Sequence, residues 1–258
     1  MPVAVSYEMA GPNDGPTVVL AHSVGSTRAM WEPQVPVLAD AGFRVISYDA
    51  RGHGKSPVPN GPYAMDDLAE DLTALLDTTG TERAHIIGLS MGGMTAMALT
   101  ARHPERVASL ALLCTSAFLQ PAQFWLDRAA TARSAGTAAM AKVVVARWFT
   151  AETCSAEPEL VAEAVAMVAS TPDEGYAACC EAIAAMDLRA GLPAVAVPTL
   201  ALAGAEDPAT PPEHLAYIAD HVPGALLAVI PDAAHLANLE RPEQVNTALL
   251  AHLELARR

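Results

Sequence analysis

The chain has 258 residues, of which 52% are hydrophobic and 5% aromatic, and its formal net charge is −14 at pH 7. This length and apolar content are sufficient for one large α/β domain whose core consists mainly of aliphatic side chains. The acidic balance excludes the basic surface with which proteins bind nucleic acids or anionic membranes, so we expect neither as a partner.

Short apolar runs alternate with helical patterns through the first half of the chain. This rhythm predicts a mostly parallel sheet that is covered by helices on both faces. In chain order we expect a strand over Thr17–Ala21, a helix over Ala29–Ala39, a strand over Phe43–Tyr48, a helix through Leu68, Leu72, Leu75 and Leu76 that ends at Gly80, a strand over Ala84–Leu89, a helix over Met91–Arg102 and a strand over Val107–Leu113.

The alternation stops after Cys114. Residues 117–192 are alanine-rich and contain no strong strand, so we expect a helical lid there, inserted into one α/β core of residues 1–116 and 193–258. The expected elements from the lid onward are helices over Leu160–Ala169 and Tyr176–Met186, a strand over Pro198–Ala203, a helix over Glu213–His221, a strand over Ala225–Ile230 and a helix over Gln244–Leu255.

The first residues and the cysteines predict a cytoplasmic protein. The opening segment MPVAVSYEMAG has no basic region and no signal-type apolar stretch, and the uncharged run Ala190–Ala205 is too short to span a membrane. The cysteines show no metal-ligand spacing, so we expect reduced and mostly buried thiols and no metal site. They are Cys114, Cys154, Cys179 and Cys180.

The segment GLSMGG, residues 88–93, fits the pattern G-x-S-x-G. It follows the predicted strand AHIIGL and opens the predicted helix MGGMTAMAL, which is the context of a nucleophile elbow. A serine in front of a helix can also be an N-cap with no chemical role. The strand and helix on its two sides favour Ser90 as a nucleophile.

A nucleophilic serine requires a base and an acid that orients the base. His235 is the predicted base, because it alone among eight histidines directly follows the last strand and precedes the last helix. Asp207 follows the preceding strand and is the predicted acid, with Glu206 and Asp232 as alternatives. The order Ser, Asp, His along the chain is the order of α/β-hydrolases.

Attack on a carbonyl creates an oxyanion, which needs N–H donors that are already in place. The amide of Met91, directly after the nucleophile, is one predicted donor. The turn after the Thr17–Ala21 strand supplies the other, from Val24 or alternatively Ser23, and His22 is expected to brace this turn. The Gly-rich segment from Tyr48 to Ser56 lacks the spacing of a phosphate-binding loop, so we interpret it as structural.

These blocks together resemble the α/β-hydrolase superfamily from Tyr7 through Leu253, apart from the inserted lid. The segments SYDARGHGKSPVPNGPY, IIGLSMGGM, GAEDPATPPEH and AAHLANLERPE are widely shared there. The lid segments RWFT and YAACCEAIAAMDLR are narrower, and they resemble the 3-oxoadipate enol-lactonases. One departure is HSVG where the superfamily often has HG-x-G, although enol-lactonases also carry Ser before the hydrophobic donor.

The resemblance implies that the protein opens 3-oxoadipate enol-lactone to 3-oxoadipate, a step in the catabolism of aromatic compounds, through a Ser-His-Asp triad and an acyl-enzyme. It implies no metal and no organic cofactor, and a small lactone or ester as the binding partner. The substrate carries a carboxylate, which a lid arginine would bind. The substrate-binding candidates are Ser23, Trp125, Arg133 and Trp148, with Arg128, Arg147 and Arg189 as further arginines.

Two alternative functions and a cofactor-free haloperoxidase-like side activity on the same triad stay open, and one further function is disfavoured. A carboxylesterase, or a lactonase for a different substrate, would use the same triad. Some α/β-hydrolase folds bind ligands without turnover, which the complete triad disfavours. A haloalkane dehalogenase is disfavoured because that chemistry uses an aspartate where Ser90 stands.

Overall fold

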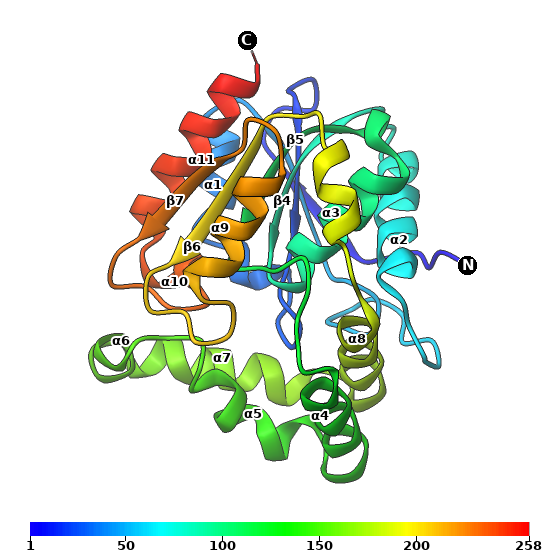
Figure 1. The fold of residues 1–258 in the computed structure, drawn as a ribbon, viewed down its shortest axis with the longest axis vertical. Coiled ribbons are helices and arrows are strands. Elements are labelled where there is room, and N and C mark those ends of the chain that lie inside the picture. Colours follow the sequence, from blue (N-terminus) through cyan, green and yellow to red (C-terminus); the bar gives the residue numbers. More distant parts are fainter. Residues whose placement is uncertain (258) are drawn as a thin grey trace.

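The centre of the molecule is a mostly parallel sheet (Figure 1). The computed structural model describes residues 1–257, and within them seven strands hydrogen-bond in the order β1-β3-β2-β4-β5-β6-β7. β1 is antiparallel to β3, and every other neighbouring pair is parallel, which confirms the predicted class of fold. The strands span β1 (Tyr7–Ala10), β2 (Thr17–Ala21), β3 (Arg44–Tyr48), β4 (Ala84–Leu89), β5 (Val107–Leu113), β6 (Thr199–Gly204) and β7 (Leu226–Ile230).

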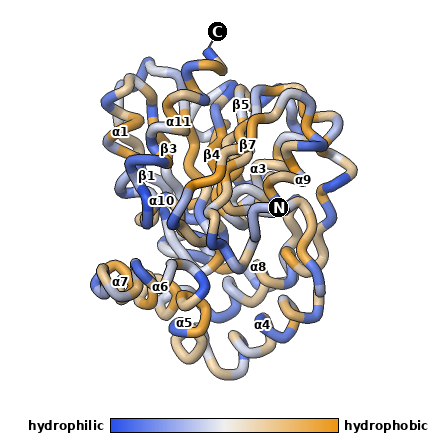
Figure 2. The backbone as a smooth tube through the Cα atoms, turned by 60° about the vertical axis from the view of Figure 1, so that its left-hand side comes forward, coloured by the Kyte–Doolittle hydropathy of each residue, from blue (hydrophilic) through white to orange (hydrophobic). Residues whose placement is uncertain are grey.

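Helices cover both faces of this sheet, and the central strands are therefore buried on both sides. Every residue of β2, β4 and β6 is buried, and Figure 2 shows hydrophobic chain concentrated in the sheet. Helices α1 and α11 lie over one face, and α3 and α9 lie over the other, with α2 packed against α3. These helices span α1 (Val35–Asp40), α2 (Met65–Thr78), α3 (Met91–Arg102), α9 (Pro212–His221) and α11 (Pro242–Ala256).

Helices α4 to α8 form a further layer, which lies below the sheet in Figure 1. They come between β5 and β6 along the chain, and α4 packs against α8 while α5 packs against α7. The two helices expected over Leu160–Ala169 and Tyr176–Met186 correspond to α7 and α8. The layer consists of α4 (Ala122–Ala135), α5 (Thr137–Val145), α6 (Ala151–Ala156), α7 (Pro158–Ser170) and α8 (Asp173–Ala185).

The structure differs from the sequence prediction in three elements. The single helix expected over Ala29–Ala39 is wrong, because a 3₁₀ turn, η1 (Arg28–Trp31), is separated from α1 by Pro33. Proline has no N–H to donate, so a continuous helix over residues 29–39 would lack a backbone hydrogen bond at Pro33. The partly exposed edge strand β1 and the short helix α10 (Ala237–Glu240) were not predicted. The other predicted helices and strands are confirmed, with small differences at their ends.

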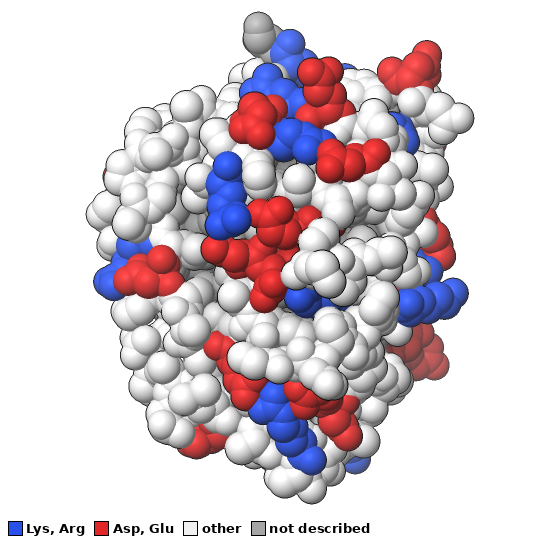
Figure 3. Space-filling model, turned by 90° about the vertical axis from the view of Figure 1, so that its right-hand side faces the viewer, with Lys and Arg blue, Asp and Glu red and all other residues white. Residues whose placement is uncertain are grey.

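Charged side chains lie on the surface in mixed groups. On the face that Figure 3 shows, basic side chains lie beside acidic ones. Among the ion pairs of the surface, Arg102 pairs with Asp66 and with Glu70, at 2.9 Å each. Exposed ion pairs of this kind contribute little to stability.

No helix within residues 1–257 has both the length and the apolar character that crossing a bilayer requires.

The cysteines are free thiols, and most of them are buried, as predicted. Cys114, Cys179 and Cys180 are buried, whereas Cys154 is exposed. Burial raises the pKa of the Cys180 thiol to about 12. A thiol that stays protonated at neutral pH is a poor nucleophile, so these buried side chains serve the packing of the core.

Candidate active site

Ser90 forms the tight turn between β4 and α3. β4 ends at Leu89 and α3 begins at Met91, which leaves Ser90 alone to reverse the chain. Its φ of 54° and ψ of −116° are strained for a residue with a Cβ. The Ser90 N–H donates to the carbonyl of Leu113 over 2.9 Å, and the Thr115 hydroxyl donates to the Ser90 carbonyl over 2.6 Å. Surrounding hydrogen bonds thus hold the strained conformation that a nucleophile elbow requires.

The glycines of G-x-S-x-G allow the chain to come close to itself around Ser90. A Cβ on Gly88 would lie 2.3 Å from the carbonyl oxygen of Gly92. A Cβ on Gly92 would lie 2.0 Å from the carbonyl oxygen of Ala21 in β2. Both distances are far inside van der Waals contact, and a close-packed interior has no space to relieve them. The spacing of the motif is therefore a packing requirement of the turn.

His235 and Asp207 meet at the carboxyl ends of β6 and β7. His235 Nδ1 lies 2.8 Å from Asp207 Oδ2, and both side chains are almost completely buried. Because a carboxylate accepts this bond, the proton lies on Nδ1 and the other ring nitrogen, Nε2, is left free to act as a base. Ser90 and His235 line the same cavity. The structure therefore brings the three predicted triad residues to one place.

The surroundings of Asp207 favour its ionised form. Burial opposes ionisation, but the His235 imidazole and hydrogen bonds from Thr210 outweigh it, so the pKa of Asp207 lies below its ordinary value. Thr210 donates its hydroxyl to Asp207 Oδ2 over 2.7 Å and its N–H to Oδ1 over 3.1 Å. The two alternative acids, Glu206 and Asp232, are exposed to solvent.

Thr210 was missed by the sequence analysis. It lines the cavity as well as holding the carboxylate of Asp207. The signal was present, since a loop aspartate often accepts hydrogen bonds from backbone N–H groups two or three residues later, and Thr210 follows Asp207 by three positions.

A cavity of about 210 Å³ separates Ser90 and His235 from the layer of α4 to α8. A larger groove of about 460 Å³ runs beside β1, but neither Ser90 nor His235 reaches it. Among residues 1–257, no cluster of three or more His, Cys, Asp or Glu side chains is arranged to hold a metal ion. The predicted site residues on the wall of the smaller cavity are Ser23, Val24, Ser90, Trp125, Trp148 and His235.

Two arginines line this cavity, and neither is the expected Arg133. They are Arg128 and Arg147, and within residues 1–257 neither forms an ion pair. The other two candidates lie outside the cavity, where carboxylates occupy their guanidinium groups. Arg133 pairs with Glu174 at 2.7 Å and with Glu181 at 2.5 Å, and Arg189 pairs with Asp187 at 2.6 Å.

The turn after β2 is held by a neutral histidine. His22 Nε2 accepts the Ala50 N–H over 2.8 Å, so the proton of the ring lies on Nδ1, which donates to the Ser23 carbonyl over 2.7 Å. Burial lowers the pKa of His22 and keeps the ring uncharged. The Ser23 carbonyl and the Val24 N–H belong to one planar peptide group, so fixing the first also orients the second. This contact gives His22 the bracing position that the sequence analysis expected.

His53 supports the same turn from the loop after β3. Its Nε2 accepts the N–H of Gly25 over 2.9 Å, and its Nδ1 donates to the carbonyl of Arg51 over 3.1 Å. Burial, followed by the proximity of His22, lowers the pKa of His53 to about 3. The Val24 and Met91 N–H groups, in contrast, donate to no other group within residues 1–257. Two free donors beside Ser90 are what an oxyanion hole needs.

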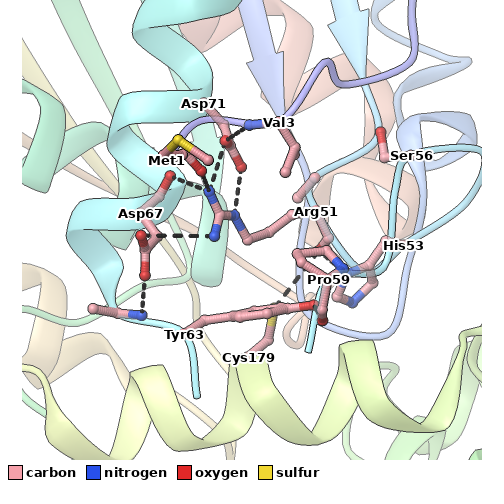
Figure 4. A network of polar contacts seen from close by, with 12 residues as sticks. Met1, Val3, Arg51, His53, Ser56, Pro59, Tyr63, Asp67, Asp71 and Cys179 are labelled. Carbon is pink, nitrogen blue, oxygen red and sulfur yellow. Dashed lines mark hydrogen bonds and ion pairs between the residues drawn. The ribbon is translucent and has the colours of Figure 1, made fainter. Parts of the chain in front are cut away.

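Arg51 ties this loop to distant parts of the chain (Figure 4). Its guanidinium donates to the two oxygens of Asp71 in α2 over 2.6 and 2.7 Å, and Asp71 also accepts the N–H of Val3 over 2.7 Å. The sulfur of Cys179 in α8 lies 3.8 Å from the Arg51 carbonyl. The loop therefore joins the N-terminal segment, α2 and α8, which agrees with its interpretation as structural.

Comparison with known proteins places this geometry among hydrolases. Residues 16–242 match the family described as alpha/beta hydrolase fold. The chain is 37% identical to 3-oxoadipate enol-lactonase 2 of Acinetobacter baylyi, over 96% of this chain and 92% of that protein. It superposes on the crystal structure of the enol-lactonase from Burkholderia xenovorans with a TM-score of 0.94, at 39% identity, covering 97% and 96% of the two chains. A thermophilic esterase from Thermogutta terrifontis with malate bound gives a TM-score of 0.93 at 34% identity, covering 98% of this chain and 94% of the esterase.

Proposed function

We propose a substrate for this chain, which belongs to the alpha/beta hydrolase fold family and is a hydrolase of ester bonds. The proposed reaction is the opening of 3-oxoadipate enol-lactone to 3-oxoadipate in the catabolism of aromatic compounds. The observation that carries this proposal is the cavity, in which an elbow serine and a histidine share the wall with two arginines that have no carboxylate partner within residues 1–257. An anionic ester is the ligand that complements such a wall.

In the proposed mechanism, the Ser90 hydroxyl attacks the lactone carbonyl while His235 Nε2 takes its proton. The N–H groups of Val24 and Met91 stabilise the oxyanion of the tetrahedral intermediate. When the intermediate collapses, the bond between the carbonyl carbon and the ring oxygen breaks, and His235 protonates the enolate oxygen that leaves. The result is an acyl-enzyme on Ser90 that still carries the opened chain.

Water then attacks the acyl-enzyme, with His235 again acting as the base. Asp207 keeps the imidazole oriented and stabilises its protonated form in both steps. Ser90 leaves with a proton from His235, and the enol of the product converts to the ketone. This conversion makes the ring opening difficult to reverse.

The arginine proposed to bind the substrate carboxylate is Arg128, with Arg147 as the alternative. The guanidinium carbon of Arg128 lies 5.3 Å from the centre of the Trp125 ring and 5.5 Å from that of Tyr176. Its Nε is buried and has no partner within residues 1–257. A positive charge held by aromatic rings, with a free hydrogen-bonding edge, is prepared to receive a carboxylate.

The layer that supplies these side chains is proposed to be a lid over residues 117–192. Trp125 and Arg128 come from α4, Val144 from α5, and Arg147 and Trp148 from the segment after α5. The lid then determines which ester is accepted, while the chemistry stays in the loops of the sheet.

The experiment that tests the proposal compares kcat/KM for 3-oxoadipate enol-lactone, a saturated lactone and p-nitrophenyl acetate. We expect the enol-lactone to be strongly preferred, and Ser90→Ala to abolish turnover of all three substrates. If kcat/KM for p-nitrophenyl acetate equals that for the enol-lactone, the substrate assignment fails. The alternative is then a carboxylesterase, and the likeness to the Thermogutta terrifontis esterase favours that alternative. Undiminished turnover in Ser90→Ala would refute the triad itself.

A further inference from the structure

The loop that carries His235 is fastened on both sides of this residue. The Ala234 N–H donates to Glu240 Oε2 over 2.7 Å, and the Leu236 N–H donates to the carbonyl of Trp148 over 2.9 Å. The backbone N–H groups that flank the proposed base are thus both bonded to groups outside the loop. One partner, Trp148, also forms part of the cavity wall.

Glu240 extends this fastening to the segment after Trp148. Its Oε1 accepts the N–H of Thr150 over 2.7 Å and the hydroxyl of Thr150 over 2.6 Å. One carboxylate of α10 therefore bridges Ala234 on one side and Thr150, the N-cap of α6, on the other. Glu240 and Thr150 are 90 positions apart in the chain.

The Glu240 carboxylate is an unusual group to place at such a contact. The residue is 4% exposed, and within residues 1–257 it forms no ion pair with a Lys, Arg or His side chain. A buried carboxylate without a cation is costly unless donors satisfy its oxygens. Here two backbone N–H groups and one hydroxyl do so, and bonds to a charged acceptor are shorter and stronger than neutral ones.

We propose that Glu240 is a positioning residue for the active site. Its carboxylate holds the His235 loop and residues 148–150 as one unit, so that the base and the Trp148 wall keep a fixed relative position. The inference rests on the proposed role of His235 as base, but not on the identity of the lactone. Since Glu240 lines no part of the cavity, it acts through His235 and not on the substrate.

The variant Glu240→Gln tests this inference. Gln has the same shape, but its amide replaces one acceptor oxygen with an NH₂ group that faces an N–H donor, so one side of the bridge must open. A displacement of the base by about 1 Å costs on the order of 100-fold in rate. With p-nitrophenyl acetate we expect kcat to fall by about 10- to 100-fold, while KM changes by less than about 3-fold. The rate at which an organophosphate labels Ser90 should fall by a similar factor.

Asp173→Asn is the control within the layer of α4 to α8, at a carboxylate that is exposed where Glu240 is buried. Asp173 also accepts from the N–H and hydroxyl of one threonine, Thr137, over 2.7 and 3.0 Å, but this contact joins α8 to α5 and does not touch the His235 loop. Its kcat should stay near that of the native protein at temperatures well below unfolding. An equal loss of kcat in Asp173→Asn and Glu240→Gln would overturn the proposal, because general weakening of the lid would then explain both.

A second pair of variants keeps the proposal testable if Glu240→Gln does not fold. Thr150→Val removes the hydroxyl that donates to Glu240, whereas Thr150→Ser keeps it. We expect Thr150→Val to lower kcat and Thr150→Ser to keep kcat near that of the native protein; equal kcat values for the two variants would contradict the bridge.

Ser90→Ala separates this inference from the triad. If Ser90→Ala is inactive while Glu240→Gln has native kcat, the positioning role alone is refuted.

Discussion

Replacing Arg128 with Met is the sharpest test of how the cavity recognises an anion. The substitution removes the guanidinium but keeps a long apolar side chain to pack against Trp125 and Tyr176. A hydrogen bond to a charged group contributes about 1.5–3 kcal/mol, and each 1.4 kcal/mol is tenfold in an equilibrium constant. We therefore expect kcat/KM for 3-oxoadipate enol-lactone to fall by about 10- to 150-fold.

The assay compares this substrate with p-nitrophenyl acetate, which has no carboxylate. Hydrolysis of the acetate ester should change by less than about 3-fold, because the carboxylate contact is absent from it. Arg133→Met is the control on the same helix, and its guanidinium is occupied by Glu174 and Glu181 outside the cavity. The reasoning is refuted if both substrates lose the same factor in Arg128→Met, or if Arg133→Met causes the larger loss on the enol-lactone.

Three further predictions concern the triad, the turn after β2 and the elbow. Asp207→Asn should lower kcat by about 10⁴-fold with little change in KM, because the amide favours the wrong imidazole tautomer; steady-state kinetics would show this. The pKa of His53, about 3 in the folded protein, lies below the ordinary value of about 6.5, so the unfolded chain binds more protons and stability falls as the pH drops below 6.5. Between pH 7 and pH 5, the free energy of unfolding measured with urea should fall by about 2 kcal/mol less in His53→Gln than in the native protein. The same pH dependence in both proteins would contradict a buried neutral ring. Gly92→Ala should lower the free energy of unfolding by about 3 kcal/mol or prevent folding, because the new Cβ would lie 2.0 Å from the Ala21 carbonyl oxygen. Gly191→Ala is the control and should be tolerated in the same urea measurement, because the nearest atom to its Cβ lies 3.5 Å away.

Much of the fold and the candidate triad could be predicted from local patterns. The buried strands are mostly apolar runs, although β4 contains His85 and β5 contains Ser109, and such runs need no distant partner to be recognised. The triad candidates follow from the same pattern, because the carboxyl ends of parallel strands meet at one edge of the sheet. Ser90, Asp207 and His235 each directly follow such a strand, or nearly so, and their meeting is a consequence of the strand order.

The arginine of the cavity could not be predicted in this way. Arg128 and Arg133 lie on the same helix, α4, and successive helical residues turn by about 100°, so the two side chains point in directions roughly 140° apart. The packing of α4 against α8 determines which direction faces the cavity. α4 has only a weakly apolar face of its own, with Ala129 and Ala132 as its buried residues, so its sequence carries no signal of that rotation.

The sequence by itself determined six of the seven strands of residues 1–257, the elbow around Ser90 and the order of the candidate triad, because apolar periodicity and turn chemistry act over a few residues. Only the tertiary structure decided which side chains of α4, α5 and the segment after α5 enter the cavity, and that Glu240 lies between Thr150 and the His235 loop. Such contacts join residues that are far apart in the chain, and they depend on how whole helices are rotated and docked. A short sequence pattern carries no information on that rotation, whereas the packing of the complete chain fixes it.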